Sequence, residues 1–310
     1  MVEQELSQQS DRDAFRLVGA GYRSHVSQGR NLSWRTRLKG MPLFSMAILL
    51  LIVLGCIFAP LLANHDPTDF YLSDLNRPPG QEFRFGTDSL GRDLYSMMWY
   101  GGRVSILVGL LGASIIAAIG IPYGCISGVA GERIDFILMR FAELCGSIPS
   151  ILFVLVLSAA FGDGSVVSIS IIIGVTGWFG LARIVRGEVR QIRDSEFILY
   201  ARACHASFPY VMLHHLIPNL VSAIMFVLVS SISSCMIMES TLSFLGLGLP
   251  VTTISWGSML SLANKALLLD TWWVVIFPGL FLVTTLLCIT NIVHDEGGQL
   301  IAGVGQLAHV

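Results

Sequence analysis

The sequence predicts an all-α membrane protein with six transmembrane helices and with both chain ends on the cytoplasmic side. Of its 310 residues, 54% are hydrophobic and 13% are charged, whereas soluble domains carry about 25% charged residues. The mean hydropathy is +0.71, so most of the chain is expected to lie in lipid. Two further observations support this fold class: apolar runs of membrane-spanning length, and an uneven distribution of arginine and lysine.

A transmembrane helix needs about 20 mostly apolar residues. The runs that qualify are 41–63, 104–130, 134–160, 166–185, 216–238 and 273–293. Pro122, Pro149 and Pro278 fall inside these runs, and each is expected to kink its helix because proline lacks a backbone N–H donor. The first run follows a long polar tail and exceeds the roughly 7–15 apolar residues of a signal peptide, so it is expected to be a retained anchor.

Basic residues set the predicted orientation, because cytoplasmic loops are enriched in arginine and lysine. With a cytoplasmic N-terminus, the inside segments carry seven basic residues in the tail, two around the second turn and five between spans four and five. The outside segments carry five. This bias predicts that the N-terminus and the C-terminus are both cytoplasmic.

The chain divides into the six spans and several polar segments. Residues 1–40 form a basic cytoplasmic tail, and residues 296–310 form a C-terminal tail. Residues 64–103 form an external loop rich in proline, glycine and aspartate. A second external loop, 241–272, contains apolar residues too few for a span, which predicts a docked or re-entrant element.

The cytoplasmic loop 186–215 contains a short predicted helix. Ser195 is a suitable N-cap, and Phe197, Tyr200, Ala201 and Cys204 recur at spacings of three and four on one face. Such a helix is suited either to lying on the membrane surface or to receiving a partner protein, and its residues leave both uses open.

Several kinds of chemistry lack their sequence motifs. There is no GxxxxGK[ST] phosphate loop, no HExxH and no GxSxG. The tandem His214–His215 has no further ligands at metal spacing, and the six cysteines form no CxxC. The chain is therefore expected to bind no cofactor, metal or ATP and not to be an enzyme. A net charge of −2 gives no indication of nucleic-acid binding.

Two acidic residues in or beside the spans have two interpretations each. A charge at mid-bilayer costs about 2.5–3.5 kcal/mol on insertion scales, so such residues usually face a cavity or a partner. Glu143 is expected either to make an interhelical hydrogen bond or to line a translocation path. Glu239, at the outer end of span five, is expected either to cap the outer loop or to act at a gate.

Several stretches together resemble a known transporter family. Residues 85–96 read FGTDSLGRDLYS and 101–109 read GGRVSILVG, while 239–248 read ESTLSFLGLG and are followed by Trp256–Gly257 and Phe277–Gly279. These motifs resemble the GTDxLGRDxxS and ExxLSFLGLG patterns of the permeases of peptide and nickel importers of the ATP-binding-cassette class. The similarity is to the C-type subunit of dipeptide and oligopeptide systems, and it covers roughly residues 40–295.

The resemblance implies a type I importer permease fold. In that fold, 41–63 is an extra N-terminal helix and 104–295 is a five-helix permease core. The external signature comprises Gly86, Thr87, Asp88, Gly91, Arg92 and Asp93. The residues implied near the path or an outer gate are Glu143, Glu239, Ser243, Phe244 and Leu245.

In this family the cytoplasmic loop carries a helix that docks into the ATPase. The residues that match it are Glu196, Leu199, Tyr200, Ala201, Arg202, Ala203, His205 and Ala206. Leu199 stands where the family has glutamate, Tyr200 where it has alanine and His205 where it has glycine. These three departures affect residues that would contact the ATPase. The identity of the loop does not depend on them, because Ile217-Pro218-Asn219 matches the end of the family's loop motif.

The resemblance also implies partners. They are a homologous permease that completes a heterodimeric pore, two ATP-binding-cassette subunits that bind ATP and Mg²⁺, an extracytoplasmic solute-binding protein and the surrounding lipid. The expected location is the cytoplasmic membrane of a bacterium or archaeon. Peptides are the expected cargo, and nickel or metal chelates are the alternative. A secondary transporter, which would typically show inverted repeats, is the alternative from another class, followed by a membrane-embedded enzyme.

Overall fold

The computed structural model describes residues 42–192 and 217–307; residues 1–41, 193–216 and 308–310 lie outside the described part. Within these ranges the regular structure is helical, apart from one isolated β-bridge between Thr87 and Asp93. The helices are α3 (Leu43–Ile57), α4 (Ala59–Leu62), α5 (Leu94–Val129), α6 (Glu132–Gly146), α7 (Ser150–Phe161), α8 (Val166–Ile192), α11 (Ile217–Phe244), α12 (Trp256–Leu260), α13 (Ala263–Leu268) and α14 (Trp273–Leu307).

The described helices correspond to the predicted apolar runs. Four of them, α5, α8, α11 and α14, are long and apolar enough to cross a membrane. Helices α6 and α7 qualify as a pair that is bent by 81°, and α3 with its continuation α4 occupies the first run. The all-helical fold class is confirmed. The count of six crossings and the orientation of both ends stay predictions.

Several helices extend beyond the apolar runs. Helix α8 continues to Ile192, so the first residues of the expected loop 186–215 are helical. Helix α5 begins at Leu94, inside the expected loop 64–103, because Asp93 caps it. Helix α11 continues to Phe244, so Ser243 and Phe244, expected in the loop 241–272, lie on the helix that also carries Glu239. Helix α14 continues to Leu307 through most of the expected tail 296–310. Hydropathy marks where a chain can meet lipid, whereas a helix ends only where its backbone hydrogen bonds end.

The three prolines inside the predicted spans behave differently. Helices α5 and α14 continue through Pro122 and Pro278, where the neighbouring helices of a membrane bundle can compensate for the missing donor. Around Pro149 the helix is interrupted: α6 ends at Gly146, and Pro149 is the N-cap of α7. A helix start tolerates proline because the first N–H groups of a helix have no intrahelical partner.

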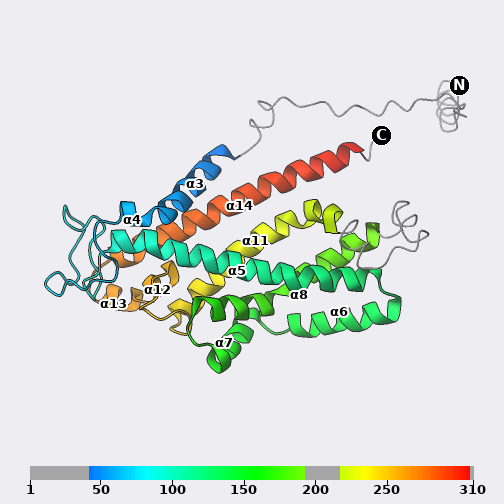
Figure 1. The fold of residues 1–310 in the computed structure, drawn as a ribbon, viewed down its shortest axis with the longest axis horizontal. Helices are drawn as coiled ribbons and strands as arrows, with labels where there is room; N and C mark the ends of the chain where they lie inside the picture. The colour runs from blue at the N-terminus through cyan, green and yellow to red at the C-terminus, as the bar shows by residue number, and fades with distance from the viewer. Residues whose placement is uncertain (1–41, 193–216, 308–310) are drawn as a thin grey trace, which may run out of the picture. The chain divides into compact units, whose positions relative to one another are not determined.

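Helix α5 lies along α8 at the centre of the bundle, and α11 packs against both (Figure 1). Glycines make the α5–α8 contact close. A Cβ on Gly124 would come within 2.5 Å of the Ala182 carbonyl oxygen, and one on Gly128 would come within 2.6 Å of Val189. Small residues at such spacing let helix backbones approach in lipid, where dispersion and hydrogen bonding replace the hydrophobic driving force.

The N-terminal helix α3 packs on α14 and α5, beside α14 in Figure 1. The ring of Trp99 occupies the space where Gly55 would carry a side chain. Arg103 donates from Nε to the Cys56 carbonyl oxygen at 2.5 Å and from Nη2 to that of Ile57 at 2.7 Å. Arg103 therefore satisfies carbonyls that the end of α3 leaves without an intrahelical partner.

The segment 241–272, predicted to be external, contains α12 and α13. Helix α12 packs against α11, α14 and α5. Trp256, its first residue, is fully buried, and its indole Nε1 donates to the Met98 carbonyl oxygen at 2.9 Å. The Trp256 backbone N–H donates to Ser105 Oγ at 3.1 Å, so two polar groups fix this docking.

Candidate functional site

The external signature forms a tight buried turn before α5. Gly86 and Gly91 have φ values of +78° and +77°, a region that residues with a Cβ rarely adopt. Asp93 follows as the N-cap of α5, and its carboxylate accepts from the Ser96 backbone N–H at 3.2 Å and from Ser96 Oγ at 2.5 Å. The motif spacing therefore specifies a turn and a helix start.

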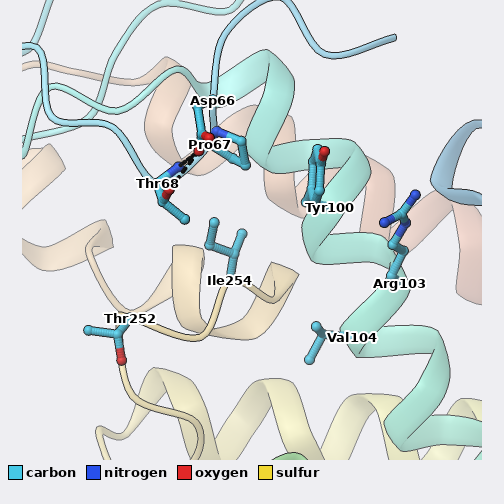
Figure 2. Close-up of a pocket in the computed structure, with 8 residues that line it drawn as sticks. All are labelled: Asp66, Pro67, Thr68, Tyr100, Arg103, Val104, Thr252 and Ile254. Atoms are coloured by element: carbon cyan, nitrogen blue, oxygen red, sulfur yellow. Dashed lines mark hydrogen bonds between the residues drawn. The ribbon is translucent and has the colours of Figure 1, made fainter. Parts of the chain in front are cut away.

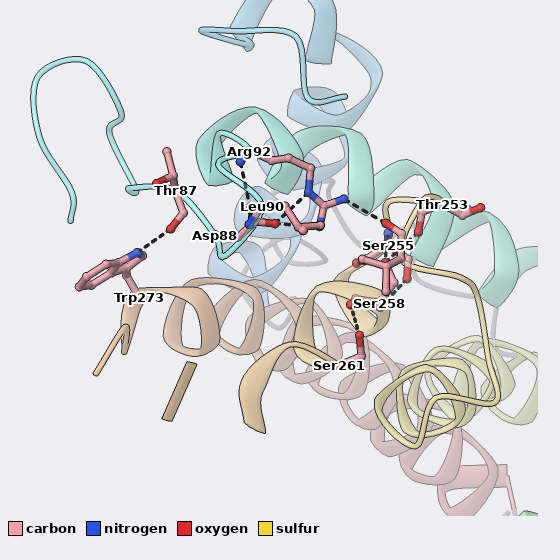
Figure 3. Close-up of polar contacts among 10 residues, drawn as sticks. Thr87, Asp88, Leu90, Arg92, Thr253, Ser255, Ser258, Ser261 and Trp273 are labelled. Carbon is pink, nitrogen blue, oxygen red and sulfur yellow. Dashed lines mark hydrogen bonds and ion pairs between the residues drawn. The ribbon is translucent and has the colours of Figure 1, made fainter. Parts of the chain in front are cut away.

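A buried ion pair lies inside this turn. Asp88 is 1% exposed and Arg92 is 3% exposed. Arg92 Nε donates to Asp88 Oδ2 at 2.8 Å (Figure 3), and Arg92 Nη1 donates to the Val251 carbonyl oxygen at 3.0 Å. The guanidinium thus joins the first external loop to the loop that precedes α12. A planar guanidinium serves two acceptors well because its donors lie in a fixed fork.

The same turn is fixed to the start of α14. Trp273 donates from Nε1 to the Thr87 carbonyl oxygen at 3.1 Å (Figure 3). Phe85 stacks on Phe277 with ring centroids 4.1 Å apart. Thr87 Oγ1 also donates to the Asp74 carbonyl oxygen. The external signature therefore connects the outer loop with α5, α14 and the segment before α12.

Glu239 is the centre of a second buried polar cluster, near the end of α11. Its side chain is fully buried, and Oε1 accepts from Ser243 Oγ and Ser255 Oγ, each at 2.9 Å. Ser240 Oγ lies 3.3 Å from Oε2. Ser243 Oγ also accepts from the Leu249 N–H at 3.0 Å. The cluster ties the end of α11 to the turn after it and to α12.

Ser255 gives α12 a defined beginning. Its side chain accepts from the Ser258 N–H at 2.9 Å, and the Ser258 hydroxyl accepts from the Ser255 N–H at 2.9 Å. This is a capping box, in which two backbone donors are satisfied reciprocally. Gly257 is required beside it, since a Cβ there would lie 2.6 Å from the Ser240 Cα and 2.9 Å from Glu239 Oε1.

An open cavity of about 400 Å³ lies beside these clusters (Figure 2). It is lined by Asp66, Pro67, Thr68, Tyr100, Arg103, Val104, Thr252 and Ile254. Thr68 donates its hydroxyl to Asp66 at 2.6 Å, and this bond, with the Thr68 N–H, lowers the pKa of Asp66 below its usual value. The cavity therefore presents an ionised carboxylate in a wall that also contains the guanidinium of Arg103.

The predicted site residues fall into separate places. The six signature residues come together, and Glu239 and Ser243 share a hydrogen bond. Phe244 and Leu245 are 45% and 51% exposed at the turn that follows. Glu143 lies on α6, exposed and paired at 3.0 Å with Arg140 of the same helix, so this contact is intrahelical and not the interhelical hydrogen bond expected as one alternative. The docking residues 196–206 and the pair His214–His215 lie outside the described residues.

One polar cluster was not predicted from the sequence. Asp135, on the first turn of α6, is 4% exposed and binds Arg186 and Arg190 of α8. The sequence does carry a signal for it, namely a lone aspartate inside a predicted apolar span. In the sequence, Arg186 and Arg190 are two of the five basic residues between spans four and five, and there they contribute only to the predicted orientation. An ion pair between two helices can be predicted only when it is known which helices are neighbours.

Comparison with known proteins places the chain in a family. Residues 120–295 match the family model described as binding-protein-dependent transport system inner membrane component, and residues 27–79 match the N-terminal TM domain of oligopeptide transport permease C. The first match covers more than half of the chain. The chain belongs to the family of binding-protein-dependent transport system inner membrane components.

Relatives match over most of their length. The dipeptide transport system permease protein DppC of Bacillus subtilis strain 168 is 34% identical over 91% of this chain and 86% of its own. The oligopeptide transport system permease protein OppC of the same organism is 34% identical over 87% of this chain and 88% of its own. OppC of Haemophilus influenzae is 38% identical over 81% of this chain and 80% of its own.

The family resemblance predicted from the motifs is confirmed by these matches. The chain is a multi-pass membrane permease subunit of an ATP-driven importer, and ATP hydrolysis in such importers belongs to separate subunits. The buried clusters described above hold helices and loops of the described part together.

Proposed function

We propose that this chain forms half of a pore that imports dipeptides and oligopeptides through a bacterial or archaeal cytoplasmic membrane. The carrying observation is that the relatives named dipeptide and oligopeptide permeases match this chain over at least four fifths of both lengths. The C-type N-terminal helix, which the second family model covers, supports the same subunit type. Metal chelates remain the alternative cargo, and the transport experiment below distinguishes them.

The other parts of the importer come from separate proteins. A homologous permease completes a heterodimeric pore, and a solute-binding protein delivers peptide on the external side. Two ATPases carry ATP and Mg²⁺ on the cytoplasmic side, and lipid surrounds the spans. The family description, binding-protein-dependent transport, supports the external partner, and the lack of a phosphate loop in the sequence supports the ATPase partners.

Different parts of the chain have different roles in this proposal. Residues 196–206 dock on an ATPase, and the external signature holds the outer loops in place. Glu239 and Ser243 shape the outer end of α11 through their shared hydrogen bond. Phe244 and Leu245, which are half exposed, present apolar side chains near the outer mouth. Glu143, exposed on α6, is assigned to the path.

The proposed cycle follows from this division. Closure of the ATPases pushes the docked loop, the helices of the two permeases re-pack, and the pore changes from facing the cytoplasm to facing outward. Peptide then enters from the binding protein, and ATP hydrolysis restores the inward-facing state. The chain supplies a path and a mechanical connection, and no covalent bond of the peptide changes.

Uptake by purified complex in proteoliposomes tests the proposal. Labelled dipeptide and hexapeptide are presented with the binding protein, with and without internal ATP, and Ni²⁺ chelate is tested in parallel. Peptide uptake should require both ATP and binding protein. If the metal chelate is taken up and the peptides are not, the cargo is a metal chelate and the peptide assignment is wrong. Peptide uptake by this chain without ATP or partner subunits would favour a secondary transporter.

A further inference from the structure

We infer that Asp135 is a positioning residue that fixes the end of α8 against α5 and α6, and thereby transmits movement of the cytoplasmic loop to the rest of the bundle. Helix α8 ends at Ile192, directly before the segment 193–216 that leads through the predicted ATPase-docking residues. The inference rests on the proposed function, because it assigns to this cluster a part in coupling.

The geometry joins three helices through one carboxylate. Asp135 Oδ1 accepts from Arg186 Nε at 2.5 Å and from Ser127 Oγ at 2.6 Å. Asp135 Oδ2 accepts from Arg186 Nη2 at 2.5 Å and from Arg190 Nη2 at 2.6 Å. Ser127 lies on α5, Asp135 on α6, and both arginines on α8. All four lone-pair positions of the carboxylate are therefore used.

This arrangement fixes direction as well as distance. Arg186 binds the carboxylate bidentately, which constrains the plane of the guanidinium. Arg190 lies one helical turn further along the same face of α8. A rotation or axial shift of the end of α8 would break the bidentate pair and move the second arginine away. The cluster therefore holds α8 in one register relative to α6.

The neighbouring backbone contact makes the connection stiff. Val185 and Val189 of α8 pack on Gly124 and Gly128 of α5, where added Cβ atoms would come within 2.7 Å of them. Val185 and Val189 are fully buried and alternate with the two arginines along α8. A displacement at the end of α8 is therefore carried to α5 and α6, because close-packed interfaces do not deform gradually.

Another ion pair on α6 provides the contrast. Arg140 and Glu143 are 60% and 49% exposed, and exposed pairs contribute little. Asp135 is nearly buried, and a buried charge that loses its partners is strongly destabilising. Because Asp135 is buried, its loss could impair folding even if it had no part in coupling. The experiment must therefore measure assembly and coupling separately.

The test uses the complete importer in proteoliposomes, with wild type, Asp135→Asn and the matched control Glu132→Gln. Glu132 is an exposed carboxylate on the same first turn. Three quantities are measured: yield of assembled complex, basal ATP hydrolysis, and peptide transported per ATP. Asp135→Asn should lower peptide per ATP by about tenfold, a typical coupling between sites, with assembly and basal hydrolysis retained. Glu132→Gln should match wild type.

Two results would overturn the inference. One is an Asp135→Asn complex that transports as much peptide per ATP as wild type. The other is a parallel loss of assembly, hydrolysis and transport, with peptide per ATP unchanged in the surviving complex. If Asp135→Asn does not assemble, Ser127→Ala decides, because it removes one hydrogen bond and leaves both ion pairs. It should lower peptide per ATP, and an unchanged ratio would refute the role.

The wild-type measurement separates this inference from the function on which it rests. Absence of ATP-dependent peptide uptake by the wild-type complex would overturn the proposed function and the coupling role together. Normal wild-type uptake with an unchanged ratio in Asp135→Asn and Ser127→Ala would overturn the coupling role alone.

Discussion

Buried charges in the described residues occur with specific partners, and Arg92 is the clearest example. Its guanidinium is shared between Asp88, four residues before it on the other side of the turn glycine Gly91, and the distant Val251 carbonyl. Burying these charged groups costs desolvation free energy, and their mutual attraction offsets this cost only when the geometry of the pair is good. The pair therefore specifies how two loops meet more than it adds to stability.

Arg92→Ala should destabilise the chain by about 3–5 kcal/mol, because it leaves Asp88 buried and unpaired. Thermal unfolding of the solubilised protein measures the change. The matched control is Arg77→Ala, since Arg77 is 45% exposed in its pairs with Asp74 and Glu82, and it should melt close to wild type. Equal melting temperatures of the two variants would contradict the special role of the buried pair.

Helix packing in this chain depends on glycines that meet bulky side chains. At the α3–α5 contact, a Cβ on Gly102 would overlap Cys56 Sγ and lie 2.7 Å from the Trp256 ring. Both Cys56 and Trp256 are buried. The same residue thus sets the position of the N-terminal helix and of the docked helix α12, two elements that are far apart in the sequence.

Gly102→Val should displace α3 from α5 and cost about 1–3 kcal/mol, as overpacking does. Disulfide formation between Ser45→Cys and Asn291→Cys reports α3 docking, because these side chains lie 3.4 Å apart. Crosslinking should fall in the Gly102→Val background. Gly180→Val on α8, where the added Cβ meets nothing within 4 Å, should leave it unchanged. An undiminished crosslink with Gly102→Val would refute the interpretation.

The assembled importer depends on contacts that one chain does not contain. Two polar clusters hold the outer loops, and the Asp135 cluster holds the end of α8 from which the predicted docking loop continues. Between them run apolar helices with many exposed side chains on α3, α6 and α14. Large exposed apolar surfaces of this kind require lipid or a partner subunit to cover them.

Ala201→Arg tests the predicted docking helix in the assembled importer. A bulky charge at this position should prevent the ATPase from seating, so hydrolysis stimulated by loaded binding protein should fall by about tenfold or more while the permease pair still copurifies. Glu132→Gln, at an exposed position on α6 outside the predicted docking residues, is the control. Unchanged stimulation in Ala201→Arg would remove the coupling role from this segment.

The sequence by itself determined the fold class, the approximate spans and the family. Apolar run length and the GTDSLGRD and ESTLSFLGLG motifs carry that information locally, because the bilayer selects for continuous apolar helices. It also indicated that Glu239 faces a cavity or a partner, and that the segment 241–272 holds a docked or re-entrant element. These features depend on residues that are close together in the sequence, so the sequence alone is enough to predict them.

Only the tertiary structure decided which distant groups meet. Arg92 reaches Val251, Trp273 reaches Thr87, and Asp135 reaches Arg186 across separations that no local pattern encodes. The same holds for the helix ends, since α5 starts at an N-cap and not at a hydropathy boundary. Burial and pairing are properties of neighbours in space, and a charge in an apolar segment acquires its role from the helix that packs against it.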